Sequence, residues 1–168
     1  RNDNLESIQQ TNDGGYILAG SSQSGINGDK TEDCRGKYWN GTDSLCYWDY
    51  WIVKIDSAGN KQWDKRYGGR YSDICYSIQQ TTDGGYVIGG TSNSGSGGDK
   101  TQYNYGIANY YWDFWIIKID SVGNKEWDRQ YGNYYDEYLQ SVNQTSDGGY
   151  ILGGYTSSGV GNDISKPS

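Results

Sequence analysis

The sequence contains no histidine and no methionine, and only one proline, among its 168 residues. Histidine is the side chain that most often moves protons at neutral pH, and it is the commonest metal ligand. Its absence excludes the Ser–His and Cys–His pairs of many hydrolases, and no phosphate-cradling P-loop motif is present. The absence of histidine and of a P-loop argues against the commonest enzyme classes.

Positive charge is also scarce. The chain has 14 Lys and Arg against 21 Asp and Glu, which gives a net charge of −7. Because proteins that bind nucleic acid need a basic surface, no nucleic-acid partner is expected. No apolar run reaches the roughly 20 residues that a membrane-spanning helix needs, so membrane insertion is not expected either.

Aromatic residues and glycine are abundant instead. The chain contains 18 Tyr, 7 Trp and 26 Gly, and aromatic residues make up 15% of a chain in which all hydrophobic residues make up 33%. Because each large aromatic side chain can bury roughly 150–250 Å², these residues can replace a missing aliphatic core. The composition predicts an ordered all-β protein with many turns.

An internal repeat organises the chain. The octapeptide DGGYILAG at 13–20 returns as DGGYVIGG at 83–90 and as DGGYILGG at 147–154. Around it, residues 7–25 match 77–95 and 141–159, and residues 48–68 match 112–132. The alignment predicts a first repeat at 1–70 with a long loop at about 29–48, a second at 71–134 with a loop at about 99–112, and a partial third at 135–168.

Each full repeat predicts four strands, which in the first copy span 5–11, 15–20, 49–56 and 60–68. Asp-Gly-Gly between the first two favours a tight hairpin turn, because glycine accepts the positive φ angles that such turns need. No stretch shows sustained helical periodicity. Since the third copy has only the first two strands, the sequence predicts ten strands in about two and a half antiparallel units.

The pattern SIQQTxDGGYILGG…DYWIVKIDxxGNKxWDKxYGG resembles the tandem repeats of secreted β-propeller-like proteins, notably those of Bacteroidota. The resemblance implies sheets of propeller-blade type and leaves the ligand unspecified. A closed propeller has about 4–8 blades. The strands missing from the third copy therefore lie in further repeats of a longer chain, come from a neighbouring chain, or are absent from an open array. A longer propeller and a stacked filament both stay open, with further repeats or copies of the chain itself as partners.

The three cysteines fall into two groups. Cys75 aligns with Leu5 and Leu139, so it is predicted to be a buried core thiol. Cys34 and Cys46 lie in the first long loop and have no counterpart in the second. Two cysteines gained together in one loop predict a disulfide and hence an extracellular or cell-surface setting. A zinc site is not expected with two cysteines and no histidine.

Aspartates recur at fixed repeat positions. Asp29, Asp99 and Asp163 lie in the Gly-rich loops that follow each second strand, where they could offer oxygen ligands to Ca²⁺. Their spacing fits no known calcium loop, so the favoured interpretation is a polar turn without a cofactor, with Ca²⁺ as the alternative.

The remaining repeated carboxylates, in the WDYW, WDFW, WDK and WDR segments, are interpreted as structural. Catalysis needs one asymmetric constellation, whereas these residues recur identically. No enzymatic activity is expected.

Two further features point to the surface. The loops are dense in aromatic side chains that suit a sugar or a protein partner, or that pack the loops onto their own sheets: Tyr38, Trp39, Tyr47, Tyr103, Tyr105, Tyr110 and Tyr111. Ser44, Ser57 and Ser121 stand in Asp-Ser-aliphatic segments that resemble bacterial O-glycan acceptors, although Asp-Ser is also ordinary turn chemistry. Asn40 in Asn-Gly-Thr is the candidate N-linked site if the protein comes from a eukaryote.

The sequence thus predicts a non-enzymatic extracellular module for structure or adhesion, assembled into a surface filament and O-glycosylated. The alternative is a carbohydrate- or protein-binding propeller that uses its aromatic loops.

Overall fold

The computed structural model describes residues 2–165. The first residue of the first predicted repeat and residues 166–168 of the third lie outside the described residues. Every helix or strand within 2–165 is a β-strand. The first sheet is antiparallel and has its strands in chain order: β1 (Asp3–Gln10), β2 (Tyr16–Ser22), β5 (Asp49–Ile55) and β6 (Lys61–Tyr67).

The second sheet and a C-terminal hairpin repeat this plan. The second sheet contains β7 (Asp73–Gln80), β8 (Tyr86–Ser92), β9 (Asp113–Ile119) and β10 (Lys125–Tyr131), again in chain order. The C-terminal hairpin contains β11 (Glu137–Gln144) and β12 (Tyr150–Thr156). Strand pairing follows the same register in each unit, including one bulge in each first strand. Residues at the same position in two units are called counterparts below.

The Asp-Gly-Gly turns explain the first hairpin of each unit. Gly14, Gly84 and Gly148 adopt φ angles of 83°, 85° and 85°, which favour glycine. In the first turn, the Asp13 carboxylate accepts hydrogen bonds from the Gly15 amide, at 3.0 Å, and from the Thr11 hydroxyl. The same bonds recur in the other two turns, so the predicted hairpins are confirmed.

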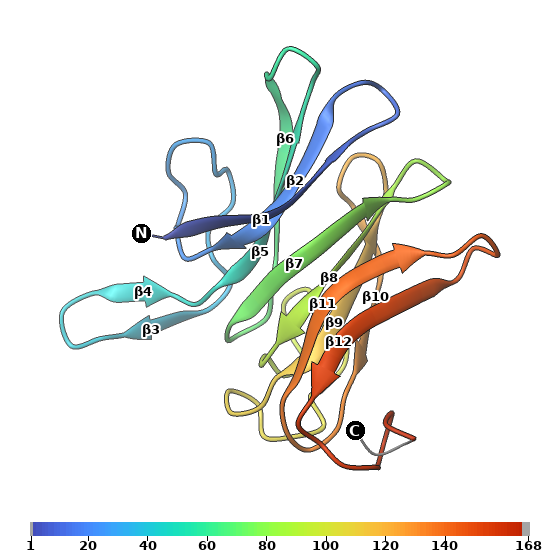
Figure 1. The fold of residues 1–168 in the computed structure, drawn as a ribbon. Coiled ribbons are helices and arrows are strands. Elements are labelled where there is room, and N and C mark those ends of the chain that lie inside the picture. Colours follow the sequence, from blue (N-terminus) through green and yellow to red (C-terminus); the bar gives the residue numbers. More distant parts are fainter. Residues whose placement is uncertain (1, 166–168) are drawn as a thin grey trace.

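One element was not predicted. The first long loop contains a short hairpin of β3 (Lys37–Trp39) and β4 (Ser44–Cys46), which brings the described strands to twelve instead of ten. This loop has 17 residues between Lys30 and Trp48, against 11 in the second loop. The added length lets it fold back at Gly41, whose φ is 99°. Figure 1 shows this hairpin projecting away from the sheets.

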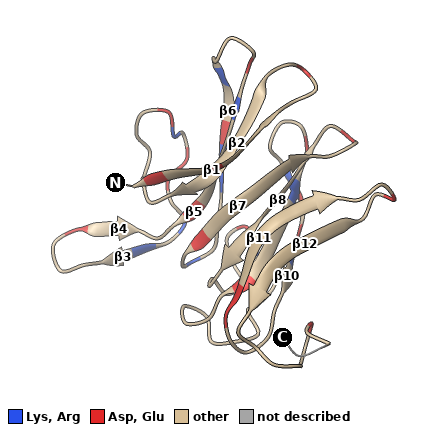
Figure 2. Cartoon of the chain, in the orientation of Figure 1, with Lys and Arg blue, Asp and Glu red and all other residues tan. Residues whose placement is uncertain are grey.

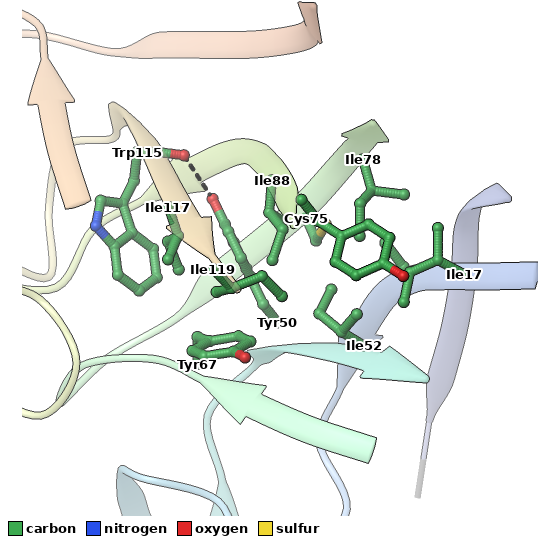
Figure 3. Close-up of a cluster of buried hydrophobic side chains, with 12 residues drawn as sticks. Ile17, Tyr50, Ile52, Tyr67, Cys75, Ile78, Ile88, Trp115, Ile117 and Ile119 are labelled. Atoms are coloured by element: carbon green, nitrogen blue, oxygen red, sulfur yellow. Dashed lines mark hydrogen bonds between the residues drawn. The ribbon is translucent and has the colours of Figure 1, made fainter. Parts of the chain in front are cut away.

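The sheets lie face to face, with the second sheet between the first sheet and the C-terminal hairpin (Figure 1). Their main core is almost wholly buried and comes from the facing sides of the first two sheets (Figure 3): Ile17, Ala19, Tyr50, Ile52, Tyr67, Cys75, Ile78, Tyr86, Ile88, Trp115, Ile117 and Ile119. Within it, the Tyr50 hydroxyl donates to the Trp115 carbonyl at 3.0 Å. Cys75 is fully buried, as predicted.

Candidate functional site

The contact between neighbouring units is built twice from the same parts. The Gln80 amide donates to the Gln9 side chain at 2.6 Å, and the counterpart amide of Gln144 donates to Gln79 at 2.5 Å. A hydroxyl bond recurs in the same way, from the Cys75 amide to Ser21 and from the Leu139 amide to Thr91. The repeated SIQQT and SVNQT segments of the sequence carry this joint, which sequence reasoning did not assign to them.

The loop aspartates also join neighbouring units. The Asp99 carboxylate accepts hydrogen bonds from the Gly68 amide at 3.1 Å and pairs with Arg66 at 2.8 Å and Arg35 at 2.9 Å. Its counterpart Asp163 accepts from the Gly132 amide at 3.2 Å. Each of these carboxylates lies in its own loop and contacts the preceding unit.

Asp29, the counterpart in the first unit, is exposed. Asp29, Asp99 and Asp163, the alternative calcium candidates, occupy three separate loops.

The outer face of the first sheet is apolar and uncovered within the described chain. We define it by Leu5, Ile8, Leu18, Trp51, Val53 and Ile55. Leu5 and Ile8 are each 58% exposed, whereas their counterparts Cys75 and Ile78 are 0% and 6% exposed. The counterparts of the other four are fully buried: Ile88, Trp115, Ile117 and Ile119. A hollow of about 360 Å³ opens on this face. Sequence reasoning named only Leu5 among them, as the counterpart of a predicted core position, and the structure leaves Leu5 exposed.

Repeated carboxylates hold the long loops to their sheets. The Asp64 carboxylate accepts two hydrogen bonds from Thr31, each at 2.9 Å, and one from the Trp51 indole at 3.2 Å. Asp128 makes the same set of bonds with Thr101 and Trp115. These contacts explain why Thr, Trp and Asp recur together.

Asp49 and Asp113 are buried deeper. Asp49 accepts the Arg35 amide at 2.7 Å, and Asp113 accepts the Tyr105 amide at 3.1 Å. Burial, reinforced in the first unit by the nearby charge of Asp73, raises the pKa of Asp49 to about 8, and burial likewise raises that of Asp113 to about 8. The Oδ1 atoms of both have no hydrogen-bond partner within residues 2–165. The folded protein therefore favours their neutral forms.

The predicted disulfide is present between Cys34 and Cys46. Asp33 lies beside it, with its ligand atoms within 4.8 Å of the two sulfurs. Because both sulfurs are bonded to each other, neither can act as a thiolate ligand. This cluster therefore offers one carboxylate and does not form a metal centre.

The aromatic loops divide into anchors and exposed side chains. Tyr47 packs edge-on against Tyr71 at 5.5 Å, and its counterpart Tyr111 packs in the same way against Tyr135 at 5.6 Å. These two loop tyrosines are half-buried and fasten each loop to the start of the next unit. The other five candidates are exposed, three of them by more than 60%: Tyr38, Trp39, Tyr103, Tyr105 and Tyr110.

The modification candidates lie at the surface. Ser57 and Ser121 are exposed in the turns between β5 and β6 and between β9 and β10. In both turns the preceding aspartate accepts hydrogen bonds from the turn amides. Ser44 is exposed in β4, and the Asn40 side chain accepts bonds from two amides at the tip of the β3–β4 hairpin.

Charge is spread over the molecule. Figure 2 shows acidic and basic residues scattered along turns, strand ends and loops, with no single basic face in this view. Across residues 2–165 the structure contains no helix able to cross a bilayer. Neither a protein-family model nor a curated protein sequence matches the chain.

Proposed function

We propose that this chain is a non-enzymatic extracellular module, with sheets of propeller-blade type, that assembles into a surface filament for structure or adhesion. The observation that carries the proposal is the outer face of the first sheet. Its six apolar residues occupy positions that the second unit buries against a preceding unit. Exposed apolar patches of this kind mark interaction surfaces. The contact between the first and second units shows which kind of surface fits such a face, namely the core-facing side of another unit.

Two further features support this function. The disulfide Cys34–Cys46 suits an oxidising, extracellular setting. The repeated carboxylates accept hydrogen bonds from loop amides, hydroxyls and indoles. These bonds support a structural role for the same aspartates that were considered as catalytic candidates. Exposed Ser57 and Ser121 leave room for O-glycans on the turns.

Imaging of the native particle and sedimentation of the purified chain test the assembly. We expect fibres, and we expect the double variant Leu5→Asp, Ile8→Asp to shorten or abolish them. Ile107→Asp, which changes a loop residue 68% exposed, is the matched control and should leave fibres intact. Discrete discs from the wild-type protein contradict the proposal. Agreement between the intact mass and the sequence mass contradicts glycosylation.

A second function is favoured by the exposed loop aromatics. Tyr103, Tyr110 and Trp39 are 78%, 73% and 68% exposed beside polar residues, an arrangement that suits stacking on a sugar ring or contact with a protein. A glycan-array screen tests this: wild-type binding that is lost in Trp39→Ala and Tyr110→Ala supports it, and no wild-type binding contradicts it.

A further inference from the structure

The C-terminal hairpin lacks a neighbour that the other two units have. β2 pairs with β5 along all seven of its residues, and β8 pairs with β9 in the same register. Within the described chain, β12 pairs only with β11. Its sequence, Tyr-Ile-Leu-Gly-Gly-Tyr-Thr, is close to that of β8. The edge of β12 therefore presents the same backbone ladder without the strand that completes it.

Among the described residues, the turn before β12 also lacks a lysine contact that the turns of the two complete units have. In the complete units, Lys54 pairs with Asp13 and Lys118 pairs with Asp83, each at 2.9 Å, and both lysines come from the strand beside the second strand. Asp147 has the same bonds to its own turn, from Thr145 and Gly149, but no lysine contacts it within residues 2–165.

The glycine that ends this turn shows the same difference. In the complete units, the carbonyls of Ile55 and Ile119 lie directly against Gly15 and Gly85, which are buried. Gly149 is exposed, and only atoms of its own turn approach it. The backbone space that a neighbouring strand fills in two units is open in the third.

A side-chain hollow lies next to this edge. It measures about 360 Å³ and is lined by Ile116, Trp127, Arg129, Tyr131, Tyr150 and Leu152. Trp127 packs edge-on against Tyr150, as Trp63 packs against Tyr86 in the preceding joint. In that joint the corresponding space is occupied by β9 and its turn.

The exposure of one tyrosine differs in the same way between the first joint, where the first and second units meet, and the C-terminal hairpin. The Tyr67 hydroxyl donates to the Gly123 carbonyl at 2.6 Å, and Tyr67 is 4% exposed. Its counterpart Tyr131 is 39% exposed.

We propose that the β12 edge, the Asp147 turn and this hollow together form a receptor, the hairpin seat, for a strand pair of the β9–β10 type that residues 2–165 do not supply. The incoming strand extends the β12 ladder, its lysine pairs with Asp147, and its aromatic and isoleucine side chains fill the hollow. An intact second copy is not the donor, because its two such hairpins are already paired within its own sheets. The proposal deepens the assembly function proposed above.

The test is binding of a carrier-fused peptide with the sequence of residues 112–132 to the purified chain. We expect saturable one-to-one binding and slower hydrogen exchange at the amides of 150–156. Changing the peptide's lysine, the counterpart of Lys118, to alanine should weaken binding roughly tenfold, since a charge-assisted bond is lost. Asp147→Asn in the chain should weaken wild-type peptide binding equally and abolish the difference between the two peptides. Asp83→Asn is the matched control and should leave peptide affinity unchanged.

Three outcomes overturn the proposal: no binding, binding shared by a scrambled peptide, or binding indifferent to Asp147→Asn. These results are distinguishable from failure of the proposed function. Fibres without peptide binding would overturn the hairpin seat and leave the filament in place, because the filament is assigned to the outer face of the first sheet. Peptide binding by a protein that forms only discrete particles would contradict the filament and leave the hairpin seat in place.

Discussion

The first and second sheets have nearly the same sequence and the same strand register, yet they differ in what covers them. β8 is buried along its whole length, and β9 nearly so, because units pack on both faces of the second sheet. In the first sheet, β1 is largely exposed and β5 alternates between buried and half-buried. The difference teaches that, in a repeat array, burial is decided by the neighbouring unit as much as by a residue's own pattern.

The tryptophan pair tests this comparison most strongly. Trp115→Ala should lower the free energy of unfolding by about 3–5 kcal/mol, because it empties a fully buried site. Trp51→Ala removes the same indole bond from a half-buried site and should cost only about 1–2 kcal/mol. Urea unfolding of both variants measures the difference. Equal losses would show that the first sheet's outer face is already covered in solution.

The loops differ by the disulfide. Closing the short loop between Cys34 and Cys46 contributes up to about 3 kcal/mol by restricting the unfolded chain. Cys34→Ala, Cys46→Ala should therefore lower the midpoint of thermal unfolding and expose the β3–β4 hairpin to limited proteolysis. The 99–112 loop, which has no disulfide, should keep its wild-type cleavage rate. Unchanged cleavage of the first loop would contradict the expected anchoring.

The buried carboxyls should behave alike in both sheets. Their folded-state pKa values, about 8 for Asp49 and Asp113, lie above the ordinary value of 3.8. The folded state then holds more protons than the unfolded state between about pH 4 and 8, so stability falls as the pH rises through this range. We expect the thermal midpoint to be lower at pH 7.5 than at pH 5. Lys100, whose pKa burial lowers to about 8, is still mostly protonated at pH 7.5 and opposes this trend only slightly.

Amide variants attribute this slope. Asp49→Asn and Asp113→Asn each mimic the neutral form, so each should remove part of the pH dependence, and Asp73, whose pKa burial raises to about 6, should carry the remainder. A wild-type midpoint that does not change with pH, or a slope that the double variant leaves unchanged, would count against neutral carboxyls at these two positions.

The smallest expected effect concerns one hydroxyl. Tyr50 donates a hydrogen bond to the Trp115 carbonyl. Its counterpart Phe114 has no hydroxyl and packs against the C-terminal hairpin. Within the described residues, that hairpin has no strand equivalent to β9, so no matching carbonyl is present. Tyr50→Phe should cost about 1 kcal/mol, the usual net value of one buried hydrogen bond. Phe114→Tyr should change the free energy of unfolding by less than that. Chemical denaturation resolves the two, and equal effects would remove the distinction.

Much of the fold could be predicted because it depends on local signals. The Asp-Gly-Gly turns and the alternating strands placed the main hairpins to within about two residues at most ends. The disulfide followed from two cysteines gained in one loop. The β3–β4 hairpin was missed because its strands have three residues each and little periodicity.

The candidate sites were harder to predict because they depend on neighbours. Ile8 and Ile78 stand in the same SIQQT segment, and nothing in that segment says which will be exposed. Tyr47 and Tyr111 read as binding residues until their contacts with Tyr71 and Tyr135 place them as anchors. The sequence left Ca²⁺ as an alternative for the aspartates after the second strands, because the partners of Asp99 and Asp163 lie in the preceding unit and could not be predicted from their own loops.

The joint between units has a consequence for symmetry. One side contributes Gln9 and Ser21, and the other contributes the amides of Gln80 and Cys75, so the two surfaces are different. Contacts of this heterologous kind cannot relate two molecules by a twofold axis; they propagate as a ring or as an open helix. An open helix built through this joint therefore has a direction, and its two chemically distinct ends add subunits at different rates.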